Sequence, residues 1–338
     1  MKENEKILKI LKELDDFLEN SEIDDSVIKK FSYYLSKLNK KYEDKVYLNY
    51  IRQEYDEKET EQRKKTFNGL TAKEWASLSR NVWNDISSPR KDVHLKHGAT
   101  YPKLLSDRLI KMYSKEGDLI FDPFLGTGTT LISAKSLNRR GIGIELNKEF
   151  YEYAKKHLEE SSNLFDFSSE IKIYNDDCRN MDKYLEDESV QLTVTSPPYA
   201  DFIHKSVKDR EKTHKKSKIK LENNSVVKPY SDLENDFGNL PYDKFLDEIE
   251  KVLELLYKKT KKNGYSAWVV KDYRDTKNKI PYIDFHSDLA KIGEKVGFKY
   301  HDLIIWDQNE RRKLILLGYP SVFYTNQNCS FIVIFRKS

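Results

Sequence analysis

Long apolar runs are missing from this 338-residue chain, and cysteine is almost absent. No stretch reaches the roughly 20 apolar residues that cross a bilayer. The first 20 residues carry charges where a signal peptide would be apolar. Two cysteines, Cys178 and Cys329, are too few for a disulfide framework or a four-thiolate zinc site. We therefore expect a cytoplasmic protein without a membrane partner.

A strong excess of one charge is also missing, because the formal net charge is only +4. Apolar residues make up 38% of the chain and charged residues 34%. This balance is typical of a globular protein with a heavily charged surface. The overall charge therefore identifies no partner, and local clusters of charge have to be considered instead.

Hydrophobic spacing divides the chain into two regions. Residues 1–85 carry apolar side chains at intervals of three and four, which predicts a helical N-terminal region. This region either contacts nucleic acid or forms a solvated bundle. From Gly117 onward, about seven short apolar runs alternate with helical stretches. Such alternation is typical of an α/β fold with a mostly parallel sheet, so we expect one α/β domain over residues 86–338.

A glycine-containing loop, "DPFLGTGTT", leads from the first of these strands into a helix. Gly126 and Gly128 allow a tight turn and a close approach of backbone to a ligand. A dinucleotide fingerprint would need a small residue where Leu131 stands, and a Walker loop would need a lysine. The loop is therefore either an ordinary tight turn or a different kind of nucleotide site.

Acidic residues end the next two strands. Glu145 ends the strand after the loop, and Asp176 and Asp177 end the third strand. Ligands of open α/β sheets bind at the carboxyl ends of strands, where a carboxylate can accept both ribose hydroxyls. A carboxylate of Asp176 or Asp177 can accept a hydrogen bond from an adenine amino group. Each acid can equally be a helix cap, but together they indicate a nucleoside pocket.

The stretch "TSPPY", residues 195–199, ends the fourth strand. This motif together with "DPFLGTGTT" resembles the amino-methylating DNA methyltransferases, which transfer a methyl group from S-adenosylmethionine to N4 of cytosine or N6 of adenine. The resemblance implies a Rossmann-like, seven-stranded sheet with an antiparallel last strand, which makes residues 86–338 the catalytic domain.

The resemblance also implies roles for particular residues. The residues implied to bind S-adenosylmethionine are Tyr101, Asp122, Pro123, Phe124, Gly126, Gly128, Thr129, Glu145, Asp177 and Cys178. The residues implied to be catalytic are Ser196, Pro197, Pro198 and Tyr199. We interpret Cys178 as a packing residue of the pocket and not as a nucleophile, and we expect no metal.

The residue types of the tetrapeptide suit this chemistry. The lone pair of an aromatic amine is delocalised into the ring. Hydrogen-bond acceptors for the amine protons help to direct the lone pair at the methyl group. The Ser196 hydroxyl and the Pro197 carbonyl can be these acceptors. Tyr199 can stack on a base that has been rotated out of the duplex. No covalent intermediate is required.

Serine at position 196 bears on which base is methylated. In the family, Asp or Asn at this position is usual for adenine, and Ser is associated with N4-cytosine. We therefore expect an N4-cytosine enzyme, with N6-adenine as the alternative. An RNA amino-methyltransferase and a catalytically inactive nucleic-acid-binding relative are more distant alternatives.

Two segments are candidates for contact with double-stranded DNA, at about residues 201–240 and 307–328. Within the first, residues 204–220 hold eight Lys or Arg and two acids, which gives a net formal charge of +6. Basic side chains supply sequence-independent affinity for phosphates. The candidate DNA-binding residues are Lys205, Lys208, Arg210, Lys215, Lys216, Lys218, Arg311 and Arg312. The family also suggests a separately acting restriction endonuclease, and the oligomeric state stays open.

Overall fold

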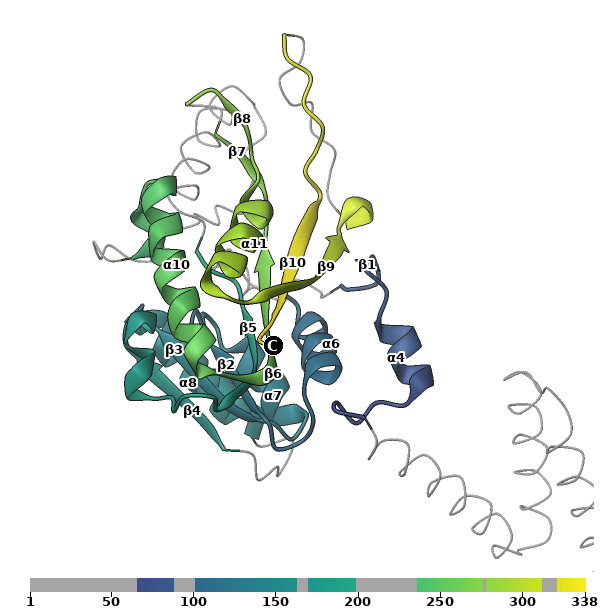
Figure 1. Ribbon diagram of the computed structural model, residues 1–338, viewed down its shortest axis with the longest axis vertical. Coiled ribbons are helices and arrows are strands. Elements are labelled where there is room, and N and C mark those ends of the chain that lie inside the picture. The colour runs from purple at the N-terminus through teal and green to yellow at the C-terminus, as the bar shows by residue number, and fades with distance from the viewer. Residues whose placement is uncertain (1–65, 88–100, 163–169, 199–235, 276–277, 312–320) are drawn as a thin grey trace, which may run out of the picture. The chain divides into compact units, whose positions relative to one another are not determined.

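The structure is a computed structural model, and it describes residues 66–87, 101–162, 170–198, 236–275, 278–311 and 321–338 (Figure 1). The chain divides into two units, residues 1–61 and 62–338. The described residues all belong to the second unit. The helices predicted before residue 66 lie outside these residues, so the predicted domain boundary at residue 85 stays a prediction.

One large sheet runs through this unit. Its strands, in spatial order, are β1 (Val82–Trp83), β9 (Lys299–Asp307), β10 (Cys329–Arg336), β6 (Thr260–Val270), β5 (Val190–Thr195), β2 (Leu119–Asp122), β3 (Arg140–Glu145) and β4 (Ile171–Asn175). Strand β10 is antiparallel to both β6 and β9, and the other pairs are parallel. The predicted fold class and the antiparallel last strand are confirmed.

All seven predicted strands form, and β1 adds an eighth at the edge of the sheet. This two-residue strand lies within the region predicted to be helical. Val82 pairs with Ile305 of β9, and the Trp83 side chain is 1% exposed in the core. Burial of this large aromatic side chain outweighs the local helical spacing.

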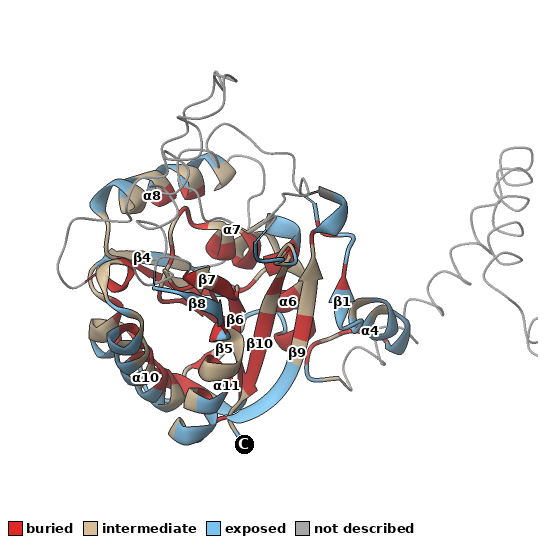
Figure 2. Cartoon of the chain, turned by 90° about the horizontal axis from the view of Figure 1, so that it is seen from above, coloured by how far each residue is buried: buried red, intermediate tan, exposed pale blue. Residues whose placement is uncertain are grey.

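Helices cover both faces of the sheet. They are α4 (Ala72–Leu78), α6 (Lys103–Tyr113), α7 (Thr129–Ser136), α8 (Lys148–Ser162), α10 (Tyr242–Lys259) and α11 (Phe285–Val296). On β10, Ile332 and Ile334 belong to the apolar cluster that contains α6, whereas Val333 and Phe335 belong to the cluster that contains α10 and α11. The central strands are therefore buried on both sides (Figure 2).

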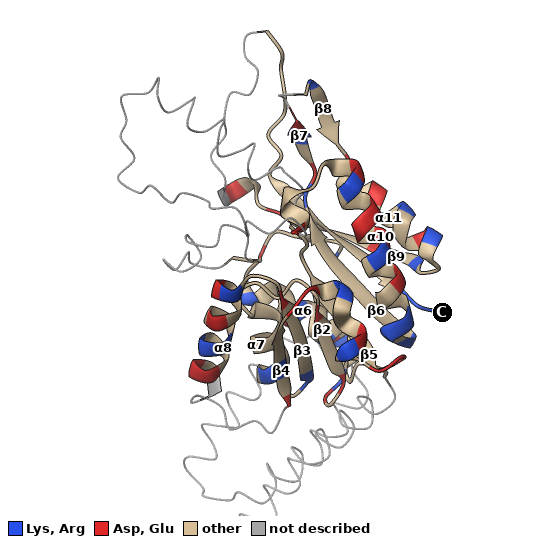
Figure 3. Ribbon diagram, turned by 90° about the vertical axis from the view of Figure 1, so that its left-hand side faces the viewer, with Lys and Arg blue, Asp and Glu red and all other residues tan. Residues whose placement is uncertain are grey.

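The charged residues of the covering helices are mostly exposed or half-buried. Figure 3 shows Lys, Arg, Asp and Glu along α8, α10 and α11, while the strands between them carry few. This distribution matches the high charged fraction of the sequence. No helix in the described ranges is long and apolar enough to cross a membrane.

A small hairpin, β7 (Tyr273–Asp275) and β8 (Ile280–Ile283), extends the chain beyond the carboxyl end of β6 (Figure 1). Asp272 fixes its base, because its Oδ2 accepts hydrogen bonds from the Tyr282 hydroxyl at 2.8 Å and from His286 Nδ1 at 2.8 Å. Asp284 Oδ1 lies 2.9 Å from the same His286 nitrogen. The hairpin is thereby attached to the first turn of α11.

Candidate active site

The glycine loop joins β2 to α7. Gly126 and Gly128 have φ values of 55° and 84°, in the left-handed region that favours glycine. A Cβ on Gly128 would lie 3.3 Å from the Ala154 Cβ of α8. Gly128 is the N-cap of α7, and the first turn of an α-helix offers backbone N–H groups to a ligand. The loop therefore brings bare backbone to the carboxyl edge of the sheet, as predicted.

Leu131 explains why the loop lacks a dinucleotide fingerprint. A Cβ on Gly141 of β3 would lie 2.7 Å from Leu131 Cδ2, and one on Gly143 would lie 2.9 Å from Leu131 Cδ1. The glycines that permit close packing of helix on strand thus stand on β3, opposite a large side chain on α7. The sequence "GIGIE" contained this signal.

Asp122 lies beneath the loop with 1% of its surface exposed. Its carboxylate accepts hydrogen bonds from the hydroxyls of Thr130 at 2.6 Å and Thr195 at 2.7 Å, and from the backbone N–H of Phe124 at 3.1 Å. The Tyr101 hydroxyl lies 2.5 Å from Thr130 Oγ1 and 3.4 Å from Asp122 Oδ2. Burial raises the pKa of Asp122 to about 6, despite these donors. Asp122 therefore connects the glycine loop to β5 and to the segment before α6.

Glu145 ends β3 directly beside the loop. Its Oε2 accepts a hydrogen bond from the Gly126 N–H at 2.7 Å, and its Oε1 accepts one from the Asn147 N–H at 2.8 Å. Burial raises the pKa of Glu145 to about 7, and the charges of Asp122 and Asp236 add to the effect. A carboxylate oxygen can accept more than one hydrogen bond, so each oxygen can still meet a ribose hydroxyl.

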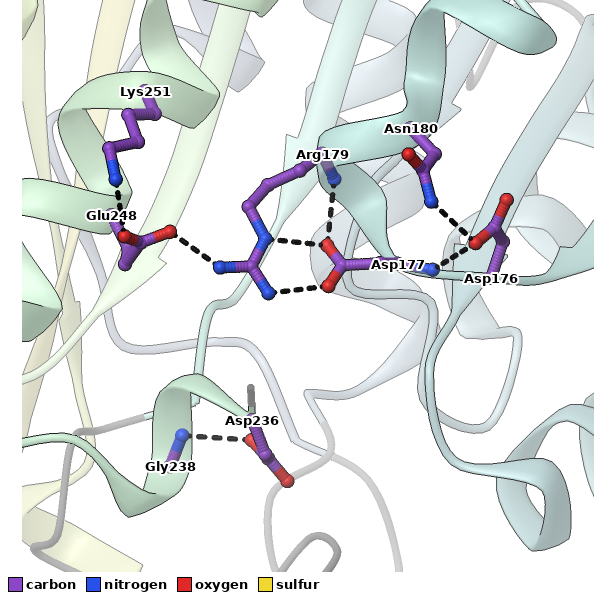
Figure 4. A network of polar contacts seen from close by, with 8 residues as sticks. All are labelled: Asp176, Asp177, Arg179, Asn180, Asp236, Gly238, Glu248 and Lys251. Carbon is purple, nitrogen blue, oxygen red and sulfur yellow. Dashed lines mark hydrogen bonds and ion pairs between the residues drawn. The ribbon is translucent and has the colours of Figure 1, made fainter. Parts of the chain in front are cut away.

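The two acids after β4 have different surroundings (Figure 4). Asp176 accepts hydrogen bonds from Tyr184 at 2.7 Å and Asn180 at 2.7 Å. Although burial opposes them, these donors hold the pKa of Asp176 well below its usual range. Asp177 caps the short 3-10 turn η1 (Cys178–Lys183) and forms a two-pronged ion pair with Arg179. Asp176 is thus engaged within its own turn, whereas Asp177 is held by an arginine.

Cys178 has its side chain in the apolar core that contains α10, with 6% exposed. Burial raises the pKa of its thiol well above the usual value. A thiol held in the neutral form is a poor nucleophile. This environment supports the packing role that we predicted for the side chain.

The SPP segment follows the last residue of β5, between β2 and β6. Thr195 is fully buried, Ser196 and Pro198 are half-buried, and Pro197 is buried. The Thr195–Asp122 hydrogen bond places the start of this segment beside the glycine loop. Our prediction missed Thr195, and its only signal was a hydroxyl residue directly before the motif.

None of the predicted DNA-binding side chains lies in the part of the chain that the structure describes. They are Lys205, Lys208, Arg210, Lys215, Lys216, Lys218, Arg312 and the side chain of Arg311 at the end of η3 (Asn309–Arg311). The predicted catalytic residue Tyr199 also lies outside it. In the segment 307–328, Gln308 is buried and donates a hydrogen bond to Ser330 Oγ at 3.2 Å. Phe323 is 76% exposed. Gln308 therefore stabilises the fold at the start of that segment.

Residues 19–156 match a family model described as DNA methylase. That range contains Tyr101, the glycine loop and Glu145, and it ends before the SPPY motif. The match therefore covers the glycine-loop half of the predicted motif pair and not the SPPY half.

Curated relatives match shorter parts of the chain. Type II methyltransferase M.HpaI of Haemophilus parainfluenzae is 47% identical over 70 residues, which are 21% of this chain and 22% of the relative. M.BglI of Bacillus subtilis is 42% identical over 93 residues, 27% of this chain and 26% of the relative. M2.DpnII of Streptococcus pneumoniae is 50% identical over 81 residues, 24% of this chain and 30% of the relative. The chain thus matches less than a third of the length of each.

Solved structures that resemble the fold include a methyltransferase from Pyrococcus furiosus, with a TM-score of 0.39 and 14% identity over 70% of this chain and 83% of that one. A TehB-like SAM-dependent methyltransferase from Corynebacterium glutamicum has a TM-score of 0.37 and 13% identity, over 69% and 87% of the two chains. The sheet and the glycine loop define the class as a Rossmann-like α/β fold. The sequence matches go one step further: over part of its length the chain is similar to DNA amino-methyltransferases, and the predicted resemblance is confirmed. They also support S-adenosylmethionine as the cofactor.

Proposed function

We propose that this protein is a site-specific DNA methyltransferase that transfers a methyl group from S-adenosylmethionine to N4 of cytosine in double-stranded DNA. The observation that carries the proposal is the hydrogen bond between Thr195 and Asp122, two residues 73 positions apart. It brings the glycine loop and the Ser196 segment to one edge of the sheet. A donor site and an acceptor site must be adjacent for direct transfer.

The cofactor side is made by the glycine loop and the strand-end acids. Positive φ angles at Gly126 and Gly128 let the backbone approach a ligand, and Glu145 lies within hydrogen-bond distance of the loop. Glu145 would hold the ribose hydroxyls, and Asp177 the adenine amino group. When bound, S-adenosylmethionine supplies an activated methyl group on a sulfonium. Alignment of the two reactants is then the largest contribution that the protein can make.

The acceptor side is made by the segment after β5. The Ser196 hydroxyl and the Pro197 carbonyl would accept hydrogen bonds from the amino group of the target base. Pro197 and Pro198 restrict the backbone, and the buried Thr195 anchors it at the end of the sheet. Tyr199 would stack on the rotated base. Stacking of one base on an aromatic side chain contributes ~1–3 kcal/mol to binding.

The choice of N4-cytosine rests on Ser196, whose hydroxyl reaches less far than the Asp or Asn usual in adenine enzymes. N6-adenine remains the second candidate. Lys205, Lys208, Arg210, Lys215, Lys216 and Lys218 would bind phosphates, and Arg311 and Arg312 would add a second basic site. The Type II names of the relatives favour a modification enzyme that acts beside a separate restriction endonuclease.

The decisive experiment uses isotopically labelled S-adenosylmethionine with unmethylated genomic DNA, followed by nucleoside digestion and mass spectrometry. N4-methylcytosine is the expected product. Label found only in N6-methyladenine would overturn the base assignment. A parallel reaction with tRNA in place of DNA tests the RNA alternative. Label in the tRNA but not in the DNA would support an RNA amino-methyltransferase and overturn the proposal.

Substitutions can separate the two sides of the site. Ser196→Ala and Tyr199→Ala should leave the affinity for S-adenosylhomocysteine within about twofold, because neither residue belongs to the cofactor side. Turnover should fall by about 10²-fold or more, since alignment of the amine is lost. Ser189→Ala, at the opposite end of β5, is the matched control and should keep turnover. Loss of cofactor binding by folded Ser196→Ala protein would refute this division of roles.

A further inference from the structure

Arg179 connects the end of β4 to α10 in a continuous chain of ionic contacts (Figure 4). Its Nε lies 2.9 Å from Asp177 Oδ1, and its Nη2 lies 2.5 Å from Asp177 Oδ2. Its backbone N–H also donates to Asp177 Oδ1 at 2.9 Å. Because two parallel contacts from a planar guanidinium fix the plane of a carboxylate, Asp177 is held in one orientation.

Arg179 is itself held from the opposite side. Its Nη1 lies 2.6 Å from Glu248 Oε2 on α10, and Lys251 Nζ lies 2.6 Å from the other Glu248 oxygen. The guanidinium carbon lies 5.1 Å from the centre of the Phe237 ring, within the range of a cation–π contact. The side chains of Asp177, Arg179 and Glu248 are 15%, 27% and 17% exposed. This arrangement is more restrained than an exposed ion pair on a surface.

The position of the chain of contacts suggests its purpose. Asp177 lies two residues after β4, which pairs with the strand that ends in Glu145, at the same edge of the sheet as the glycine loop. A carboxylate here recognises an adenine amino group only if its acceptor oxygen points correctly and stays ionised. The contacts with Asp177, together with those from Glu248, raise the pKa of Arg179 and keep it positively charged beside that carboxylate.

We propose that Arg179 is a positioning residue that makes Asp177 selective for the 6-amino group of the cofactor's adenine, and that Glu248 of α10 holds Arg179 in place. The inference rests on the proposed function, because it assigns Asp177 to the adenine. Arg179 does not touch the reacting atoms, so its substitution should change recognition of the cofactor more than methyl transfer from the bound cofactor.

Calorimetry with two ligands tests this role. S-adenosylhomocysteine carries the 6-amino group, and S-inosylhomocysteine carries an oxygen in its place. Wild-type protein should prefer the adenine ligand by about 10- to 100-fold, because the oxygen cannot donate to a carboxylate. Arg179→Met should lower this preference by about tenfold, with little change in affinity for the inosine ligand. Arg179→Lys should restore part of the preference, since lysine keeps the positive charge but cannot make the two parallel hydrogen bonds of a guanidinium.

Two further variants make the test specific. Lys183→Met removes another cation of the same turn, which contacts Asp176 at 3.2 Å, and should leave the preference unchanged. In an Asp177→Asn background, Arg179→Met should have no additional effect on the preference, because there is no carboxylate left to position. Glu248→Gln should lower the preference less than Arg179→Met and provides a second measurement if Arg179→Met does not fold.

Each outcome bears on one claim. A preference that is unchanged in folded Arg179→Met protein would overturn the positioning role. Tighter binding of S-adenosylhomocysteine by that variant would also overturn it, because Arg179 would then compete with the adenine. If wild-type protein bound neither ligand, the proposed function would fail, and this inference would fail with it.

Discussion

Glu145 predicts an unusual dependence of stability on pH. Its pKa rises from 4.5 to about 7 on folding, mainly because the carboxyl group is buried. A group whose pKa is higher in the folded state favours folding at low pH, and this contribution is lost as the pH rises through the folded value. Between pH 5 and pH 8, this one group should therefore lower the free energy of unfolding by roughly 2 to 3 kcal/mol.

The substitution Glu145→Gln should remove that pH dependence. The amide cannot ionise, and one of its two hydrogen bonds to backbone N–H groups will be lost. This loss lowers stability equally at both pH values, so it cancels when the change between pH 5 and pH 8 is compared with the wild type. The other titrating groups cancel in the same way, except for the part of the Asp122 titration that depends on the charge of Glu145, because these two carboxyl groups interact.

Urea unfolding followed by tryptophan fluorescence at pH 5 and pH 8 provides the measurement. Wild-type protein should lose roughly 2 to 3 kcal/mol more than Glu145→Gln protein over this interval. Glu149→Gln removes an exposed carboxylate from the first turn of α8 and should behave like the wild type. Equal changes in wild type and Glu145→Gln would show that Glu145 does not titrate between these pH values.

Two further predictions concern α11. Gly293→Ala should destabilise the protein by about 1–3 kcal/mol in urea unfolding, because the new Cβ would lie 2.2 Å from Phe335 Cε1 of β10. An unchanged unfolding midpoint would show that Phe335 can move aside without a cost in stability. Although burial opposes it, the hydrogen bond to Asp272 and the charges of Asp272 and Asp284 raise the pKa of His286. The contribution of His286 to stability should be fully present below about pH 6.5 and lost as the pH rises through the raised pKa. An NMR titration of the His286 ring measures this pKa. A midpoint at or below that of free histidine would contradict this reasoning.

The edge of the sheet that holds the site could be predicted from local sequence. Asp122, Glu145 and Asp177 each follow a short apolar run, and the carboxyl ends of parallel strands meet at one edge. No knowledge of strand order is needed for that prediction, since all these strands point the same way. The antiparallel direction of β10, in contrast, was supplied by the resemblance and not by the residues themselves.

The contacts within the site could not be predicted in this way. The Thr195–Asp122 hydrogen bond depends on β5 lying next to β2, which no local pattern indicates. Asp176 and Asp177 are the same residue type at adjacent positions, and only the turn that follows gives the arginine to one of them. The strand at Trp83 was missed because it has only two residues and its stability comes from distant packing.

The neighbouring positions of β2 and β5 have a consequence for how such a protein can diverge. The two halves of the site are connected through the sheet, whereas the segments that follow the strands can change in length and charge without displacing Asp122 or Thr195. Residues 200–235 follow directly after Tyr199 in the chain. On the proposed function, insertions and substitutions there would leave Asp122 and Thr195 in place. On the proposed function, one methyl-transfer chemistry could therefore be kept while the recognised DNA sequence changes from one descendant to the next.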